Sequence, residues 1–349
     1  MSKIKIGFVG TGGMGQMAHL HNYAVLDTCE VVALAELRPE TGKLVAARYG
    51  VPRVYDSHSD MLANEKLDAI VASQPFDRHS VLLPDLYAAV PFLFTEKPLA
   101  TSVEAGEKLV EASKKHGCVH MVGYHKRSDP ATIYTKELIS EWQRAGKLGA
   151  MKYIRILMPA GDWIARGFTG LLNTGEEVPA LEREPMPADM KPEIAEKYVS
   201  FVNYYIHQVN LMRYLLGEPY TVAFAESSGV VLAVESKSGI PGIIEMTPYQ
   251  TTVEWEESAL IAFAKGYIKL RLPAPLAVNR AGTVEIYRDP GQSVPERIFP
   301  TLPWVHAMHQ QAINFVKVCR GEGLPPCDAS EAVEDLKIAR EYIRMRFEV

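Results

Sequence analysis

Cysteine is scarce in this 349-residue chain, and its first residues show no signal-peptide pattern. Its four cysteines include no pair with Cys-x-x-Cys spacing, which argues against a cysteine-based zinc site. Residues 1–7 lead directly into a strand pattern rather than an apolar leader. Disulfides are rare in reducing compartments. We therefore expect a cytoplasmic protein with free thiols at Cys29, Cys118, Cys319 and Cys327.

Long apolar runs and an excess of positive charge are also missing. The chain has 37 Lys and Arg residues against 42 Asp and Glu residues, a formal net charge of −5. A general nucleic-acid-binding protein needs a basic surface, and a membrane span needs a longer apolar run. His306 and His309 lack further ligands at zinc spacing, so we predict no metal site. The expected partner is a small molecule, with no nucleic acid and no membrane.

A glycine motif follows the first predicted strand. The segment Gly10-Thr-Gly12-Gly-Met-Gly15 comes directly after the β-rich residues 4–9 and opens a helical pattern. In this context G-x-G-x-x-G indicates dinucleotide binding, because its glycines allow a tight turn, close approach of a pyrophosphate, and helix–strand packing. The start of the helix adds free N–H groups. The residues predicted to contact the cofactor here are Gly10, Gly12, Gly13, Met14 and Gly15.

An acid at the end of the second predicted strand bears on the choice of cofactor. Glu36 follows residues 31–35, about 20 residues after the glycines, where a carboxylate binds ribose hydroxyls. Such a carboxylate repels a 2′-phosphate, so we predict NAD. Arg38 is able to accommodate that phosphate, so NADP is not excluded, and a surface position for Glu36 is the alternative.

The alternation of strands and helices continues through residue 122 and then stops. Alternating strands and helices predict a doubly wound parallel sheet. Between Thr221 and Leu272 the chain instead shows strand after strand, which predicts a mostly antiparallel sheet. The predicted fold class is α/β, with a Rossmann domain over residues 1–123 and a substrate-binding and oligomerisation domain over residues 124–349. The last helices are expected to be able to pack back on the first domain.

Two later strand ends add polar residues to the same predicted edge. The apolar run 92–94 ends in Glu96-Lys97-Pro98, and a cis peptide is an option before Pro98. Ligands bind outside the carboxyl ends of such strands, so we predict that Lys97 holds a substrate hydroxyl; a solvated loop lysine is the alternative. The predicted cofactor contacts at these ends are Gln74, Pro75, His79, Glu96 and Lys97. For His79 a packing role is an equal alternative.

A polar stripe marks the predicted helix over residues 201–217. Asn203, His207 and Asn210 have i, i+4, i+7 spacing, so they share one helix face, while neighbouring faces are apolar. A polar stripe on a buried helix needs partners or a ligand. The stripe therefore predicts a polar cleft with His207 at its centre.

Residues 159–197 lack clear periodicity and contain several prolines. Such a long irregular segment inside a domain is usually functional or an oligomer arm. Asp162, Trp163 and Arg166 are its most site-like residues, because an aromatic ring stacks on a sugar face. We predict Asp162 and Trp163 in the substrate site, with a packing role for the tryptophan as the alternative.

Taken in order, these motifs resemble the Gfo/Idh/MocA oxidoreductase family, which includes glucose–fructose oxidoreductase and inositol dehydrogenase. The resemblance rests on the glycine loop, Glu36, Gln74-Pro75 with His79, Glu96-Lys97-Pro98, and Gly123-Tyr-His-Lys-Arg127. It implies that His207 is the catalytic acid/base, that Lys97 orients the hydroxyl, and that Tyr124 and Arg127 join the substrate site. The family's usual pattern is Asp-x-x-x-His-x-x-Asp, so Asn203 and Asn210 depart from it. The resemblance also implies a homodimer or homotetramer formed through the second sheet, with Val231, Ile243 and Ile261 as candidate interface residues.

Three functions are carried forward from the sequence. The first is an NAD(P)-dependent oxidoreductase acting on a secondary alcohol of a sugar, cyclitol or glycoside. The second is a redox-neutral glycosidase or lyase that holds NAD tightly and passes through a transient keto-sugar. The third, a dinucleotide-sensing binding protein, leaves Lys97 and His207 without a task.

Overall fold

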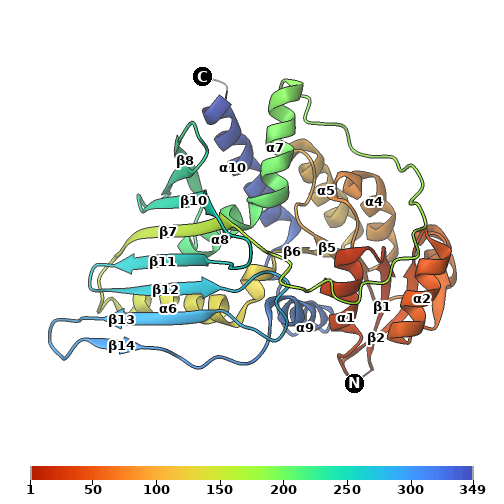
Figure 1. Ribbon diagram of the computed structural model, residues 1–349, viewed down its shortest axis with the longest axis horizontal. Helices are drawn as coiled ribbons and strands as arrows, with labels where there is room; N and C mark the ends of the chain where they lie inside the picture. The colour runs from red at the N-terminus through yellow and green to blue at the C-terminus, as the bar shows by residue number, and fades with distance from the viewer. Residues whose placement is uncertain (1, 348–349) are drawn as a thin grey trace. The chain divides into compact units, whose positions relative to one another are not determined.

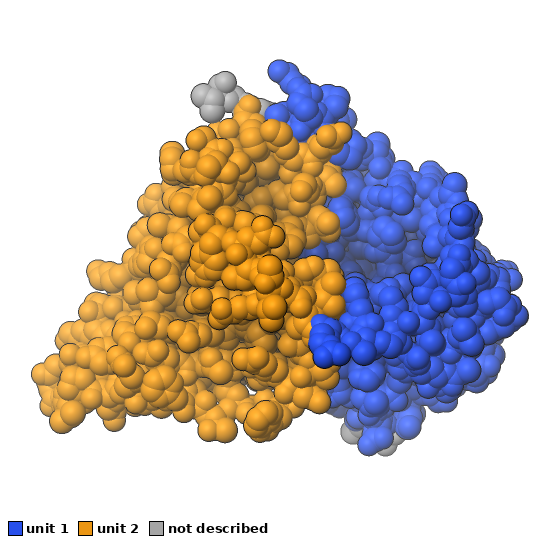
Figure 2. Space-filling model, in the orientation of Figure 1, with its two compact units in different colours: residues 1–124, 166–195, 308–336 blue, residues 125–165, 196–307, 337–349 orange. Residues whose placement is uncertain are grey.

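The computed structural model describes residues 2–347. It contains two compact units, which Figure 2 shows in two colours. Unit 1 comprises residues 1–124, 166–195 and 308–336, and unit 2 comprises residues 125–165, 196–307 and 337–349. The predicted division at residues 123 and 124 thus lies one residue from the first crossing between units. It omits the two later segments that belong to unit 1.

Unit 1 is built on a parallel sheet of six strands in the order β3-β2-β1-β4-β5-β6. This confirms the doubly wound sheet that the alternating pattern predicts. Because all the strands point the same way, their carboxyl ends meet at one edge, where ligands bind in such sheets. The strands are β1 (Ile4–Val9), β2 (Cys29–Ala35), β3 (Arg53–Tyr55), β4 (Ala69–Ala72), β5 (Phe92–Glu96) and β6 (Val119–Gly123).

The helices of unit 1 alternate with its strands, and α5 shows how such a helix begins. Ser102 caps α5, and its side chain accepts a hydrogen bond from the amide of Ala105. A serine at this position supplies an acceptor that the first amides of a helix need. The helical elements are η1 (Met14–Leu20), α1 (His21–Tyr23), α2 (Pro39–Tyr49), α3 (His58–Asn64), η2 (Phe76–Arg78), α4 (His79–Ala89), α5 (Val103–His116) and α9 (Ala307–Cys319).

Helix α9, although late in the chain, completes the core of unit 1. The ring of Phe315 is fully buried and lies 5.7 Å from the ring of Phe94 and 6.3 Å from that of Tyr23, between centroids. Tyr23 in turn meets Phe8 edge to face at 5.5 Å. Aromatic pairs at these separations add to the free energy of burial. The amphipathic pattern predicted for residues 304–320 thus corresponds to a helix that covers the parallel sheet.

Unit 2 contains an eight-stranded sheet in the order β14-β13-β12-β11-β7-β10-β9-β8. Only the β7–β10 pair is parallel, so the prediction of a mostly antiparallel sheet is confirmed. Strands β8 to β12 occupy the stretch from Thr221 to Leu272 that the sequence predicts to be strand-rich, whereas β13 and β14 lie beyond it. The strands are β7 (Met151–Ala160), β8 (Tyr220–Ala225), β9 (Val231–Ser236), β10 (Pro241–Gln250), β11 (Glu257–Phe263), β12 (Gly266–Leu272), β13 (Thr283–Arg288) and β14 (Glu296–Ile298).

One face of this sheet is covered by helices α6 (Pro130–Ala145) and α8 (Ile206–Leu216), and Figure 1 shows α6 behind the strands. Ile261 is fully buried on the covered face, so its prediction as an interface residue is wrong. Side chains alternate between the two faces of a strand, so an error of one residue in the prediction puts a side chain on the wrong face. Val231 and Ile243 are half-buried, at positions that alternate with fully buried neighbours.

The single helix predicted over residues 201–217 is in fact two helices. A single residue, Tyr205, separates α7 (Pro192–Tyr204) from α8. The run Tyr204-Tyr205-Ile206 combines aromatic and β-branched side chains, which weaken a helix. Asn203 therefore lies on α7 and is exposed, whereas Asn210 lies on α8 and is buried. The start of α7 also shortens the segment predicted to be irregular.

The remaining elements are η3 (His125–Ser128) and α10 (Ala329–Phe347). Asp328 caps α10 by accepting a hydrogen bond from the amide of Glu331, as its sequence suggests. Within residues 2–347, every helix is too short or too polar to cross a membrane.

Candidate functional site

The three glycines of the motif serve three different needs at the end of β1. Gly10 has φ +89°, and a Cβ there would lie 2.1 Å from Gln74 Nε2. A Cβ on Gly15 would lie 2.5 Å from the carbonyl oxygen of Gly10. A Cβ on Gly12 would meet nothing within 4 Å, and Gly12 is exposed. The loop is therefore shaped by Gly10 and Gly15, while Gly12 leaves open space at the surface.

Glu36 ties the end of β2 to this loop. Its Oε2 accepts hydrogen bonds from Thr11 N at 2.8 Å and Thr11 Oγ1 at 2.7 Å. Arg38 donates to both carboxylate oxygens, from Nε at 2.7 Å and from a terminal nitrogen at 3.0 Å. Burial would raise the pKa of Glu36, but the hydrogen bonds from Arg38 and Thr11 outweigh it and lower that pKa. Glu36 is thus an ionised anchor whose two oxygens already bind protein donors.

Of the predicted residues after β4, Gln74 lies against the glycine loop and His79 lies beneath the surface. Arg78 donates to Gln74 Oε1 at 3.3 Å. His79 is fully buried, with Nδ1 2.9 Å from the carbonyl oxygen of Leu99, and burial lowers its pKa. Pro75 precedes the short helix η2. This geometry gives His79 a packing role, which the sequence left as the alternative to cofactor binding.

The Glu96-Lys97-Pro98 segment lies at the end of β5, and the peptide bond before Pro98 is cis. Glu96 is buried; its Oε1 lies 2.7 Å from His19 Nε2, and its Oε2 accepts a hydrogen bond from the amide of Lys97 at 3.1 Å. Burial would raise the pKa of Glu96, but the bond with His19 outweighs it and lowers that pKa. The Lys97 side chain is half-buried. Glu96 therefore fixes the backbone that presents Lys97.

A buried hydrogen-bonded chain supports the same strand end. His120 on β6 contacts Thr95 Oγ1 through Nε2 and Tyr87 OH through Nδ1, both at 2.9 Å. Burial lowers the pKa of His120 to about 3, so the ring is neutral at ordinary pH. A neutral ring has one donor and one acceptor, which matches one hydroxyl on each side.

Residues 168–184, named here the edge segment, follow the carboxyl edge of the parallel sheet. In Figure 1 this stretch is part of the long yellow-green connection that passes α2 and α1. Phe168 lies against Gly13, with a ring atom 3.3 Å from the position of a Cβ. Leu172 exchanges two hydrogen bonds with the buried side chain of Gln16, at 2.9 and 3.1 Å. The edge segment thus begins directly above the glycine loop.

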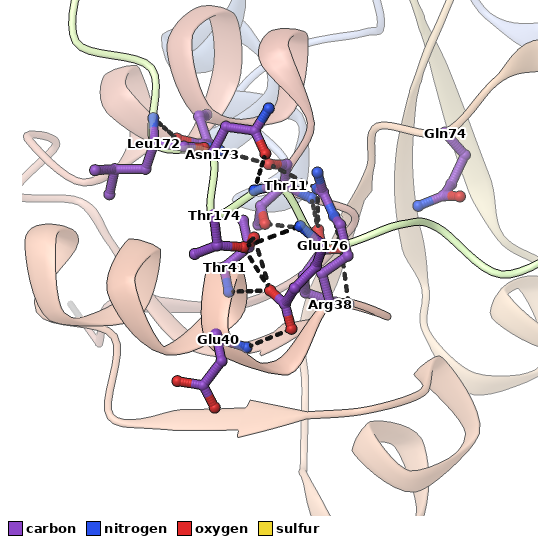
Figure 3. A network of polar contacts seen from close by, with 12 residues as sticks. Thr11, Arg38, Glu40, Thr41, Gln74, Leu172, Asn173, Thr174 and Glu176 are labelled. Carbon is purple, nitrogen blue, oxygen red and sulfur yellow. Dashed lines mark hydrogen bonds and ion pairs between the residues drawn. The ribbon is translucent and has the colours of Figure 1, made fainter.

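The edge segment then binds the loops after β2, β4 and β5 in turn. Glu176 accepts hydrogen bonds at the start of α2, as Figure 3 shows. Arg183 pairs with Asp77 at 2.6 Å. Glu184 accepts from the amide of Ser80 at 2.7 Å and from that of Thr101 at 2.9 Å. The edge segment therefore contacts the loops after β1, β2, β4 and β5. These loops lie at the edge of the sheet where a dinucleotide binds in such a fold.

In unit 2, η3 and α8 bring together residues that are far apart in the sequence. The rings of His125 and His207 meet edge to face with centroids 4.6 Å apart. Arg127 donates from Nε to Asn210 Oδ1 at 2.7 Å, and both side chains are buried. The Arg127 guanidinium also lies 4.8 Å from the ring centroid of Tyr214. The two elements thus form one polar cluster, in which His207 lies beside His125 and Asn210 beside Arg127.

A buried carboxylate extends this cluster. Glu257 on β11 accepts hydrogen bonds from Lys126 and from Gln208, the latter at 2.8 Å. Trp255 donates to the same carboxylate at 3.3 Å. The Glu257 carboxylate thus connects η3, α8 and β11 through hydrogen bonds.

The other predicted substrate residues have more varied positions. Asp162 caps a turn by accepting hydrogen bonds from the amides of Ile164 and Ala165, at 3.1 and 3.0 Å. Trp163 is half-buried, and its carbonyl oxygen accepts from the amide of Leu276. Tyr124 is buried in unit 1, at the end of β6. Asn203 is exposed on α7, whereas His207 and Asn210 lie on α8.

Comparison with known proteins supports the resemblance. Residues 4–124 match the family model described as the oxidoreductase family with an NAD-binding Rossmann fold, Gfo/Idh/MocA. Over these residues the chain is similar to the NAD-binding domain of that family. The match covers the glycine loop, Glu36 and Glu96-Lys97-Pro98, so it agrees with the resemblance that the sequence motifs indicate.

Curated proteins that are similar to this chain include named inositol dehydrogenases. Myo-inositol 2-dehydrogenase from Thermotoga maritima is 23% identical over 239 residues, which is 68% of this chain and 62% of that protein. Inositol 2-dehydrogenase from Rubrobacter xylanophilus is 32% identical over 149 residues, 42% of each chain. The matched segments thus span less than two thirds of these relatives.

The fold extends over the whole chain. The crystal structure of an oxidoreductase domain protein from Kribbella flavida superimposes with a TM-score of 0.75 at 18% identity, covering 100% of this chain and 98% of that one. At this identity the likeness establishes the fold alone.

The sequence did not predict two features of unit 1. His19 pairs with Glu96, and the only local signal was a histidine in the helix that follows the glycine loop. Glu176 and Glu184 bind loops that lie far from them in the sequence. Acids in an irregular segment are ordinary surface residues, so no pattern distinguishes these two.

Proposed function

We propose that the protein is an NAD(P)-dependent oxidoreductase that transfers a hydride between nicotinamide and a secondary alcohol of a sugar, cyclitol or glycoside. The observation that carries the proposal is the open space at Gly12, at the carboxyl edge of a parallel sheet whose residues match an NAD-binding family. Backbone without a side chain at that place allows a pyrophosphate to approach.

The residues of unit 1 fit such a cofactor. The glycine loop would hold the pyrophosphate, and the loop after β2 would hold the adenosine end. Bound nicotinamide would accept or supply the hydride at the carbon that bears the hydroxyl. Gln74 and Lys97, at the ends of β4 and β5, belong to the loops that the nicotinamide end meets in this fold.

We assign the proton chemistry to two side chains. Lys97 orients the reacting hydroxyl, on a backbone that Glu96 and His19 hold in place. His207 takes the hydroxyl proton as the general base and returns it in the reverse reaction. Its ring contact with His125 supports the orientation of the imidazole. Asn203 and Asn210 contribute amide groups where the family pattern has acids, and Asn210 binds Arg127.

The chemistry of the polar cluster in unit 2 supports this substrate class. Amide, guanidinium and imidazole groups bind hydroxyls through several hydrogen bonds. The named relatives act on inositol, which carries only hydroxyl groups. Tyr124, Arg127, Asp162 and Trp163 are proposed to complete the contacts with such a substrate.

A second candidate is supported by the edge segment. Its contacts reach four loops of the cofactor edge, which favours a nucleotide that does not leave between turnovers. A redox-neutral glycosidase or lyase needs this retention, because the stored hydride returns to the same substrate after elimination.

One incubation distinguishes these candidates. Purified protein with NAD⁺ is given a panel of free sugars, cyclitols and glycosides, while NADH and substrate are both followed. NADH that accumulates in step with substrate loss supports the dehydrogenase. Substrate loss without net NADH, abolished after the nucleotide is stripped, supports the redox-neutral enzyme. Nucleotide binding without turnover of any substrate in either direction contradicts both and favours a dinucleotide sensor.

We further propose a homodimer or homotetramer formed through the open face of the unit 2 sheet. Tyr267 and Tyr287 stack there with ring centroids 5.4 Å apart, and Val231 and Ile243 are half-buried. Light scattering of wild-type protein and Ile243→Arg would test this, since the charge should shift the mass toward a monomer. A cytoplasmic location is proposed from the four cysteines, none of which forms a disulfide within the described residues.

A further inference from the structure

The start of α2 is an anion site that the chain itself occupies. Arg38 precedes this helix but makes no side-chain cap, and Pro39 opens it, so the amides of Glu40 and Thr41 need acceptors from elsewhere. Glu176, more than a hundred residues away in the sequence, supplies them. Its Oε1 accepts from Glu40 N at 3.1 Å, and its Oε2 accepts from Thr41 N at 2.8 Å.

Two hydroxyls complete the arrangement around this carboxylate. Thr41 Oγ1 lies 3.0 Å and Thr174 Oγ1 lies 2.7 Å from Glu176 Oε2. Figure 3 shows the carboxylate directed at the first turn of α2, with Arg38 beside it. The Thr174 hydroxyl, followed by the amides of Thr41 and Glu40, lowers the pKa of Glu176 to about 2. The group is therefore an anion at neutral pH, placed at the positive end of a helix dipole.

This position matters because a Rossmann domain binds the adenosine ribose of its cofactor at the same place. In a Rossmann domain the residues just after β2 distinguish a free 2′-hydroxyl from a 2′-phosphate. Here that stretch contains Glu36, Arg38 and the first amides of α2. Arg38 is the natural phosphate ligand, but Glu36 already engages it through both carboxylate oxygens. A 2′-phosphate would need the very donors that Glu176 holds, and the two anions would repel each other.

We propose that Glu176 is a specificity-determining residue that makes the adenosine end select NAD over NADP. This rests on the proposed function, since it concerns the cofactor of the same edge. Glu36 fixes the glycine loop and Arg38, and Glu176 excludes the phosphate. Removing the Glu176 carboxylate frees two amides and two hydroxyls beside a guanidinium, which together form a phosphate site. The edge segment keeps its other contacts, at Gln16, Asp77, Ser80 and Thr101.

The test compares NAD⁺ and NADP⁺ dissociation constants for wild type, Glu176→Ala and Glu176→Gln. Glu177→Ala is the matched control, because its side chain is a neighbouring exposed acid. We expect the ratio of the NADP⁺ to the NAD⁺ constant to fall at least tenfold in Glu176→Ala. A smaller fall is expected in Glu176→Gln, which keeps the shape but not the charge, and none in the control. Adenosine 2′,5′-bisphosphate, set against adenosine 5′-monophosphate, should show the same change as a competitor.

The outcomes separate this proposal from the proposed function. NAD⁺ binding with an unchanged ratio in both Glu176 variants overturns the role of Glu176 alone. Equal weakening of both nucleotides would mean that Glu176 is only a helix cap, and it also overturns the specificity assignment. Failure of every protein, wild type included, to bind either nucleotide overturns the proposed function and this proposal with it.

Discussion

The two units arrange their polar residues in different ways. In unit 1 the key groups lie on loops at strand ends, and a distant segment of the chain binds those loops one after another. In unit 2 they lie on η3 and α8 and are held by buried partners such as Glu257. The first arrangement depends on contacts made from outside the sheet, and the second on packing within a core. In unit 1 the loops at the strand ends leave room for a ligand. In unit 2 buried protein partners already bind the polar side chains of the cluster.

We expect the largest effect on stability from a change in the aromatic core that packs α9 against the parallel sheet of unit 1. Phe315→Ala removes a fully buried ring that contacts Tyr23 and Phe94. We expect a loss of about 3–5 kcal/mol in the free energy of unfolding, measured by denaturant titration. Phe299→Ala, which removes an exposed ring, should change stability by about 0.5 kcal/mol or less. Equal effects of the two would show that α9 is not part of this core.

Lys97→Ala tests the strand-end group of unit 1. If Lys97 orients the reacting hydroxyl, its removal should lower kcat by about 100-fold or more. NAD⁺ affinity should fall much less than kcat, because the main proposed role of Lys97 is at the reacting hydroxyl rather than at the cofactor. Lys108→Ala, at an exposed position of the same unit, provides the control. Full turnover by Lys97→Ala would remove Lys97 from the mechanism.

His207→Ala makes the same comparison in unit 2. Loss of the general base should lower kcat by about 100-fold and flatten the pH–rate profile, whereas a purely structural loss would leave the shape of the profile unchanged. His116→Ala removes an exposed histidine and should match wild type. A pH profile of unaltered shape in His207→Ala would assign the proton transfer to another residue.

The first unit's motifs were readable from sequence because each carries a local constraint. A tight turn at φ +89° requires glycine at position 10. Apolar runs that alternate with helical patterns predict the parallel strands. The break at Tyr205 was not readable, because aromatic and β-branched residues weaken a helix without fixing where it ends, and the apolar pattern continues across the break. The contacts that Glu176 makes with α2 and that His19 makes with Glu96 were not readable either, because these partners lie far away in the sequence.

The smallest effect is expected from the buried pair beneath Lys97. The pKa of Glu96 in the folded protein lies below the ordinary value of 4.5, so ionisation of Glu96 contributes stability above that pH and loses it as the pH falls further. In Glu96→Gln this contribution is gone. Wild type should therefore lose stability more steeply than the variant below pH 4.5, in denaturation series at several pH values. Glu177→Gln, an exposed acid, should keep the wild-type slope, and parallel curves for wild type and Glu96→Gln would contradict the role given to the His19 pair.

The central claim, that the edge of unit 1 binds a dinucleotide at the glycine loop, is tested most directly by NAD⁺ binding to Gly12→Val. A Cβ added at Gly12 meets nothing within 4 Å, so the variant should fold with the wild-type Tm. The side chain would nevertheless project into the place proposed for the pyrophosphate. Gly323→Val makes the same change at another exposed glycine with open space. The account predicts that calorimetric titration finds NAD⁺ affinity lowered at least tenfold in Gly12→Val and unchanged in Gly323→Val; wild-type affinity in a folded Gly12→Val would contradict it.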